Sequence, residues 1–145
     1  MKGLIQRVSQ ASVKVDQQIL GSIESGILLL LGVEKGDDEA KADKLLHRVS
    51  HYRIFEDEQG KMNRSLLDVG GGLLVVSQFT LAAETRKGMR PSFSSAAPPQ
   101  LGERLYEYFL SQAKQQFTRV ASGQFGANMD VSLVNQGPVT FLLET

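Results

Sequence analysis

Two short segments combine polar side chains with exposed backbone, and they are the candidates for chemistry. The first motif, Ser77-Gln78-Phe79-Thr80-Leu81, follows a run of apolar residues that is typical of a buried strand. Backbone N–H groups at such a strand end can point at a ligand, beside hydroxyl groups, an amide and an aromatic ring. Ordinary polar capping of a strand is the alternative, and the spacing alone does not exclude it.

The second motif is Asn135-Gln136-Gly137-Pro138-Val139-Thr140. Gly-Pro often forms a hairpin turn, and physical reasoning alone favours that interpretation. Glycine also leaves the backbone bare, so that a ligand can approach closely. Ligand binding is therefore the alternative for this motif.

Several common kinds of catalytic site are missing from the sequence. The chain has no cysteine, which excludes thiolate metal sites and a cysteine nucleophile. Its only histidines, His47 and His51, have a spacing that can bind a metal, but the glutamate of the zinc-protease motif is absent. We therefore interpret them as surface residues. Because nucleophile-elbow and phosphate-binding glycine motifs are also absent, we expect neither a metal nor another cofactor.

The charge balance limits the kind of nucleic acid that the chain can bind. Its 16 Lys and Arg residues equal its 16 Asp and Glu residues. Proteins that follow a long stretch of nucleic-acid backbone usually carry a basic excess, so any bound RNA should be contacted at few phosphates, such as at one end. Arg86, Lys87 and Arg90 form a local basic cluster opposed by Glu84. Phosphate contact and a solvated loop are equally open interpretations of this cluster.

The elements that position these motifs predict one mixed α/β domain over residues 1–145. Hydrophobic periodicity predicts two helices, at roughly Glu39–Arg53 and Gln100–Gln116, the second with Leu105 and Tyr108 on its inner face. Alternating or continuous apolar runs predict strands at Leu4–Val8, Ser12–Val15, Gly26–Val33, Leu73–Ser77, Met129–Asn135 and Val139–Leu143, the last two joined by a tight turn. Ala82–Pro99 reads as a long loop. This order favours a curved sheet or β-barrel-like core covered by two helices.

No signal peptide is visible, and no apolar run approaches the roughly 20 residues of a membrane span. The lack of cysteine also fits a reducing compartment. We therefore expect a cytoplasmic protein that has no contact with a membrane.

The two motifs together resemble the signature motifs of the D-aminoacyl-tRNA deacylases, also called D-tyrosyl-tRNA deacylases. The resemblance covers essentially the whole chain, and the motif order and length match. It also includes the segments Ile5–Val8, Leu31–Val33, Tyr52–Phe55, Gly60–Asn63 and Gly88–Phe93.

This resemblance implies a homodimer that binds the acceptor end of D-aminoacyl-tRNA and hydrolyses the ester between a D-amino acid, or glycine, and the terminal ribose. It implies catalytic residues at Ser77, Gln78, Phe79 and Thr80, and substrate-binding residues at Arg7, Met129, Asn135, Gly137 and Pro138. We expect a cis Gly137–Pro138 bond that enters the pocket of the other subunit. Its carbonyl groups would accept hydrogen bonds from the substrate amine, and the motif would crowd out an L side chain.

Two mechanisms remain open. Thr80 is a possible nucleophile, but the sequence offers no histidine base for it. The alternative uses the free 2′-hydroxyl of the terminal adenosine to activate water, while the protein supplies positioning and backbone N–H groups around Phe79 and Thr80 as an oxyanion hole. We prefer the alternative because it accounts for the missing His, Cys and metal ligands. An RNA-end-binding module without activity and a hydrolase of another acyl ester are the competing functions.

Overall fold

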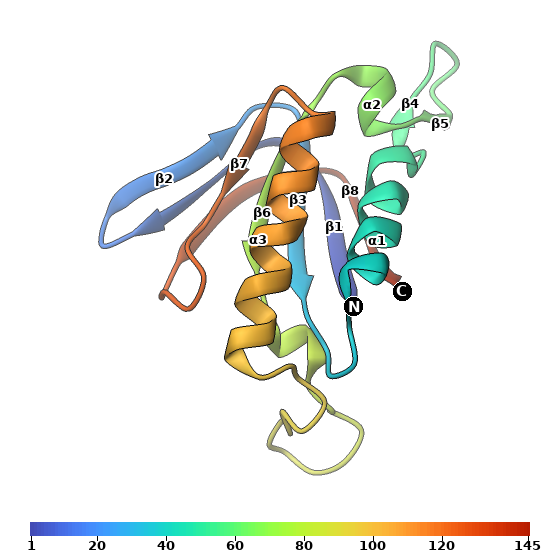
Figure 1. Cartoon of the computed structure of the whole chain (residues 1–145). Helices are drawn as coiled ribbons and strands as arrows, with labels where there is room; N and C mark the ends of the chain where they lie inside the picture. The colour runs from blue at the N-terminus through green and yellow to red at the C-terminus, as the bar shows by residue number, and fades with distance from the viewer.

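A strongly curved six-stranded sheet lies behind two long helices in the computed structural model, which describes residues 1–145 (Figure 1). The strands of this sheet are β1 (Lys2–Val15), β2 (Gln18–Ile23), β3 (Gly26–Gly32), β6 (Gly72–Ser77), β7 (Val120–Ser122) and β8 (Asp130–Glu144). A separate ribbon is formed by β4 (Phe55–Glu56) and β5 (Met62–Arg64). The helices are α1 (Glu39–His51), α2 (Leu66–Val69) and α3 (Pro99–Gln116), with a 3₁₀ turn, η1 (Phe79–Ala82). The predicted barrel-like core with two covering helices is confirmed.

The sheet has the order β2-β1-β3-β6-β7, and β8 pairs with the other edge of β1. The β3–β6 and β6–β7 pairs are parallel, because α1 and α3 serve as their crossover connections. The sheet curves until β2 approaches β7: a Cβ atom at Gly21 would lie 2.9 Å from the carbonyl oxygen of Ser122. This close approach nearly closes the barrel.

Apolar residues fill both sides of the central strands. The larger core cluster joins Leu45 and Val49 of α1 and Phe109 of α3 to Ile27 and Leu73 of the sheet. A smaller cluster lies inside the curve of the sheet and consists of Val8, Ala11, Val13, Ile23, Leu28, Leu74 and Val76. Burial on both faces explains why β3 and β6 read as continuous apolar runs instead of alternating ones.

The predicted tight turn at Gln136-Gly137-Pro138 is wrong. Strand β8 pairs antiparallel with β1 along its whole length, and its register moves from Thr140 opposite Gln6 to Asn135 opposite Val8. Four residues of β8, from Gln136 to Val139, therefore face one residue of β1 and form a bulge. The Asn135 amide bridges the bulge, since it accepts from the Val139 N–H at 2.7 Å and donates to Thr140 Oγ1 at 2.8 Å.

The helix predictions are confirmed with small changes at the ends. Asp38 caps α1 by accepting from the N–H of Lys41, and α1 ends at His51 because Tyr52 is extended. Helix α3 begins at Pro99. Proline is tolerated at this first position because a backbone N–H there would have no hydrogen-bond partner within the helix. The two N-terminal strands predicted separately, Leu4–Val8 and Ser12–Val15, are parts of the single long strand β1. None of the helices combines the length and apolar character that crossing a membrane requires.

Candidate active site

The first motif lies at the lower end of β6, where the strand passes into η1 beside the start of α3 (Figure 1). The Gln78 N–H donates to the Leu31 carbonyl at 2.8 Å, which fixes the end of β6 against β3. Ser77 and Gln78 are half-buried, whereas Phe79 and Thr80 are exposed, with 58% of Phe79 accessible. The motif thus places polar groups and a ring at the rim of the sheet.

An apolar cavity of about 270 Å³ opens at this rim. Its lining comes from the ends of β3 and β6, the start of α3 and the segment before β8: Leu31, Val33, Ser77, Phe79, Ala97, Pro99, Gly102, Tyr106, Phe125 and Gly126. A mostly apolar cavity with a few polar groups at one side is the usual form of a small-molecule site. Here the polar side is the first motif.

A second cavity of about 260 Å³ adjoins the first one and shares Ser77, Phe79 and Gly126 with it. Met129 lines this second cavity together with Gln78. The structure therefore brings the predicted binding residue Met129 next to the predicted catalytic residues. The first motif forms the wall between the two cavities.

Thr80 has no neighbour that could remove its proton. The Gln78 side-chain amide donates to Thr80 Oγ1, and no His, Asp or Glu is hydrogen-bonded to this hydroxyl group. An amide is not a base at neutral pH in either of its two orientations. The observed contacts position the hydroxyl group without activating it as a nucleophile.

The second motif is fixed by a buried arginine. Arg7 is 7% exposed; its Nε–H donates to the Gln136 carbonyl at 2.9 Å and its Nη1 donates to the Ile54 carbonyl at 2.7 Å. The Gly137–Pro138 bond is cis, as expected, and residues 136–138 of the bulge are exposed. Arg7, Asn135, Gly137 and Pro138 are thus brought together on β1 and β8.

The two motifs do not meet within one chain. The bulge belongs to β8 and the first motif follows β6, and these strands are separated by β1 and β3. Three strand spacings amount to roughly 14 Å across the sheet. No residue of the second motif lines either cavity.

A family model described as D-Tyr-tRNA(Tyr) deacylase matches residues 4–144. The chain belongs to this deacylase family. It is 66% identical over 145 residues to a protein of Stutzerimonas stutzeri named D-aminoacyl-tRNA deacylase, and 63% identical over 145 residues to a protein of the same name from Pseudomonas fluorescens; both matches cover 100% of each chain.

Solved structures show the same fold. A structure titled "c-Myc DNA Unwinding Element Binding Protein" has a TM-score of 0.95 and 38% identity, and the match covers 100% of this chain and 99% of that one. A probable eukaryotic D-amino acid tRNA deacylase has a TM-score of 0.85 at 16% identity, with 99% and 98% coverage, which shows the likeness of the fold alone.

Tyr106 lines the apolar cavity of the candidate site, and the sequence interpretation missed it. It is buried, and its hydroxyl group donates to the Val75 carbonyl at 3.0 Å, two residues before the first motif. Burial, followed by repulsion from Glu107, raises the pKa of Tyr106 to about 12, so the phenol stays a neutral donor. Tyr108, predicted on the inner face, is only half-buried and donates instead to Asp43 at 2.9 Å. The inner face of α3 is marked by the helical spacing of its buried residues, Gly102, Leu105, Tyr106 and Phe109.

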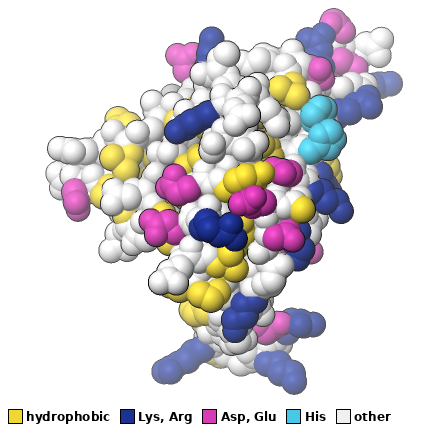
Figure 2. Space-filling view, in the orientation of Figure 1, with side chains coloured by type: hydrophobic (Ala, Val, Ile, Leu, Met, Phe, Trp, Pro, Cys, Tyr) yellow, Lys and Arg dark blue, Asp and Glu magenta, His cyan; other side chains and the backbone are white.

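The loop between η1 and α3 packs against the first motif. Phe93 packs against Phe79 with their ring centres 5.1 Å apart, and Glu84 pairs with Ser92 across the base of the loop. Arg86 forms an ion pair with Glu84, and its hydrogen bonds lower the pKa of Glu84 to about 2. Lys87 and Arg90 are exposed and have no ion-pair partner, and Figure 2 shows basic side chains gathered at this lower end of the molecule.

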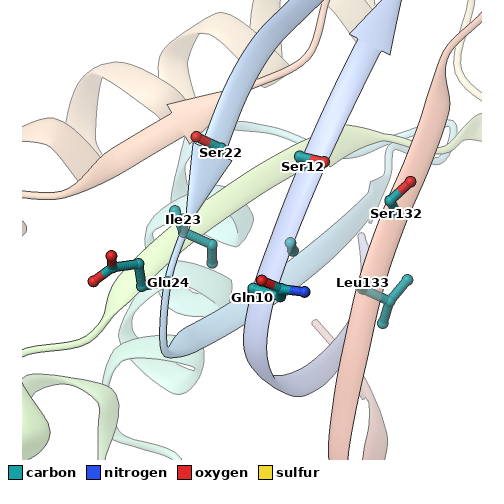
Figure 3. A pocket seen from close by; sticks show the side chains of 8 residues that line it. Gln10, Ser12, Ser22, Ile23, Glu24, Ser132 and Leu133 are labelled. Atoms are coloured by element: carbon teal, nitrogen blue, oxygen red, sulfur yellow. The ribbon is translucent and has the colours of Figure 1, made fainter.

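Two other features lie away from the apolar cavity. His47 and His51 are exposed on α1 and stack with ring centres 4.2 Å apart, and neither lines a cavity of the site. A shallow polar groove of about 400 Å³ lies over β1, β2 and β8, where Gln10, Ser12 and Ser132 are seen on its walls (Figure 3). This groove contains no residue of either motif, whereas the apolar cavity contains Ser77 and Phe79 and is therefore the candidate active site.

Proposed function

We propose that this chain hydrolyses the ester bond of D-aminoacyl-tRNA, and of glycyl-tRNA, and releases the free amino acid and tRNA. One observation carries the proposal: the first motif forms the polar rim of an apolar cavity in a chain that belongs to the deacylase family over residues 4–144. Such an enzyme would remove wrongly attached amino acids before translation uses them. We place this activity in the cytoplasm.

The apolar cavity suits the terminal adenosine of tRNA. This nucleoside is the same in every substrate, whereas the amino-acid side chain differs from one substrate to the next. A cavity of fixed shape suits the nucleoside, which is constant, better than the variable side chain. The aromatic rings of Phe79 and Phe125 offer faces on which the adenine base can stack. The ester would then lie at Ser77–Thr80, with the side chain of the amino acid directed toward solvent.

Catalysis would be assisted by the RNA itself. The 2′-hydroxyl of the terminal adenosine helps to activate the attacking water, and the N–H groups of Phe79 and Thr80 stabilise the developing oxyanion. Two observations support this mechanism. The Thr80 hydroxyl group is hydrogen-bonded only to the Gln78 side-chain amide, and no side chain caps the leading N–H groups of η1.

Chiral selection would need a homodimer. In this proposal, Gly137 of the partner subunit enters the pocket, where the bare backbone accepts hydrogen bonds from the substrate amine and leaves no room for an L side chain. The bulge is exposed and rigidly held by Arg7, yet it is about three strands away from the pocket of its own chain. Strand β8 also exposes Val134, Phe141 and Leu142, an apolar surface that a second copy would cover.

Subunit mixing tests this arrangement. Gly137→Ala breaks the bulge, because its Cβ would lie 2.6 Å from Val139 Cγ2 at a φ of 140°. Phe79→Pro removes the ring and one proposed oxyanion donor at a helix position that tolerates proline. Each variant alone should fail to hydrolyse D-tyrosyl-tRNA, and their mixture should recover activity because one hybrid site is complete. No recovery in verified mixed dimers would contradict a site shared between subunits.

A further inference from the structure

A methionine lies fully exposed at the tip of the loop between η1 and α3. Met89 is 100% accessible, whereas every other large apolar side chain of the protein is at least partly covered. Gly88, at a φ of 71°, makes the turn at this tip. The flanking Lys87 and Arg90 are exposed and have no ion-pair partner. A single exposed apolar residue is ordinary on a protein surface, but an apolar group between two free cations is typical of a nucleic-acid contact.

The base of this loop is closed like a short hairpin. The Glu84 N–H donates to the Ser92 carbonyl at 2.8 Å, and the Ser92 N–H donates to the Glu84 carbonyl at 3.1 Å. The Glu84 carboxylate also accepts from the backbone N–H of Arg86 at 2.9 Å, and from its Nε and Nη2 at 2.9 and 2.6 Å. These contacts hold the tip away from the body of the protein. They also neutralise Arg86, so that the cations at the tip are Lys87 and Arg90.

The loop tip is within reach of the start of an RNA duplex whose 3′ end lies at the first motif. Phe93 packs against Phe79 with ring centres 5.1 Å apart, and Met89 is four residues from Phe93, which spans at most roughly 13 Å. The loop extends away from the sheet at this end of the molecule (Figure 1). A tRNA has about four unpaired nucleotides at its 3′ end, which cover roughly 14 Å when their bases stack at about 3.4 Å. The two lengths match.

We propose that Met89 packs against the outermost base pair of the acceptor stem of tRNA, while Lys87 and Arg90 contact the phosphates beside it. This inference rests on the proposed function, because it takes the 3′ end of tRNA to lie at the first motif. The outer face of that base pair is flat, apolar and uncovered where the 5′ strand ends. A flexible, polarisable thioether adapts to any base pair, so Met89 recognises the end of the duplex and not its sequence.

The test measures binding of an uncharged RNA hairpin that reproduces the acceptor stem with its unpaired 3′ strand. Met89→Ala should weaken binding about tenfold and leave the dependence of log affinity on log salt unchanged, because it removes a stacking contact and no charge. Lys87→Gln should instead lower that slope by about one. The unpaired strand alone has no base pair, and it should bind the wild type and Met89→Ala equally. No loss of affinity for the hairpin, or the same loss for the single strand, would overturn the inference.

Two variants control for the chemistry and the place of the contact. Met89→Phe should bind the hairpin at least as tightly as the wild type, since an aromatic ring also stacks on a base. If it binds as weakly as Met89→Ala, the contact is not stacking and the inference fails. Met62→Ala removes another exposed methionine, on β5 at the opposite end of the molecule, and should leave binding unchanged.

Steady-state kinetics separates this role from one at the ester. Met89→Ala should raise KM for D-tyrosyl-tRNA about tenfold with kcat unchanged, and it should hydrolyse the D-tyrosyl ester of adenosine, which has no stem, as the wild type does. A loss of activity on both substrates contradicts the inference. Failure of the wild type to hydrolyse D-tyrosyl-tRNA would refute only the proposed function, because the hairpin titration does not depend on hydrolysis.

Discussion

Replacement of Arg7 by lysine tests whether the bulge serves the active site or only the fold. Arg7 holds two carbonyl oxygens, of Gln136 and Ile54, and no carboxylate neutralises it. A lysine ammonium cannot reproduce the planar two-point contact, so Arg7→Lys should lose one charge-assisted hydrogen bond. Such a bond contributes about 1.5–3 kcal/mol to the free energy of unfolding. For a chain of this length the loss corresponds to a fall in Tm of roughly 4–10 °C.

The effect on hydrolysis should exceed the effect on stability. At a loss of about 2 kcal/mol the protein is still almost wholly folded, since domains usually have about 5–15 kcal/mol of stability. The freed Gln136 carbonyl lets the bulge shift, and a misplacement of about 1 Å in a site costs on the order of a hundredfold in rate. We expect kcat/KM for D-tyrosyl-tRNA to fall by about that factor.

The matched control is Arg53→Lys. Arg53 also makes two contacts, to the carbonyl and side-chain oxygens of Asn63 at 3.0 and 2.8 Å, but these are exposed. It should change stability by less than about 0.5 kcal/mol and leave hydrolysis intact. Urea unfolding measures the stability of both variants, and steady-state kinetics measures their hydrolysis of D-tyrosyl-tRNA. An Arg7→Lys protein that loses stability but keeps kcat/KM within threefold would refute a functional role for the bulge.

Three further outcomes are expected. Thr80→Ala should keep kcat within about tenfold of the wild type, whereas tRNA ending in 2′-deoxyadenosine should lose at least about a hundredfold; complete inactivity of the folded variant would indicate a protein nucleophile. Chelator treatment and the double change of His47 and His51 to alanine should leave kcat unchanged, and recovery upon adding metal would contradict this. Changing Lys87 and Arg90 to glutamine should weaken tRNA binding and reduce an already shallow salt dependence, and a wild-type slope that implies six or more phosphate contacts would reveal a larger basic surface.

Much of the fold could be predicted because its strongest signals are local. The runs in β3 and β6 are apolar on both faces, and α1 follows a clear capping carboxylate. Strands of two or three residues, such as β4, β5 and β7, are too short to show a period and were not predicted. In strand β2, apolar and polar residues alternate too weakly for the strand to be distinguished from the adjacent turn.

The geometry of the site depended on contacts that no single segment reveals. The bulge in β8 was interpreted as a hairpin because Gly-Pro usually ends a strand; the side chain of Asn135 and the buried Arg7 let the strand continue. The burial of Tyr106 likewise depends on its partner Val75, 31 positions away. The motif residues could be named from the resemblance, which also implies that the second motif serves the pocket of another subunit, but the strands β1 and β3 that separate the two motifs on one chain could not be predicted.

The central claim is that the chain reads the chirality of an aminoacyl ester on tRNA. The most direct measurement compares release of tyrosine from D-tyrosyl-tRNA and L-tyrosyl-tRNA by the same purified protein, at equal substrate concentration and with a chelator present. We expect the D ester to be hydrolysed with a kcat/KM at least about a hundredfold above that of the L ester, which corresponds to about 2.7 kcal/mol of discrimination. Equal hydrolysis of both esters, or no turnover of the D ester, would contradict the claim.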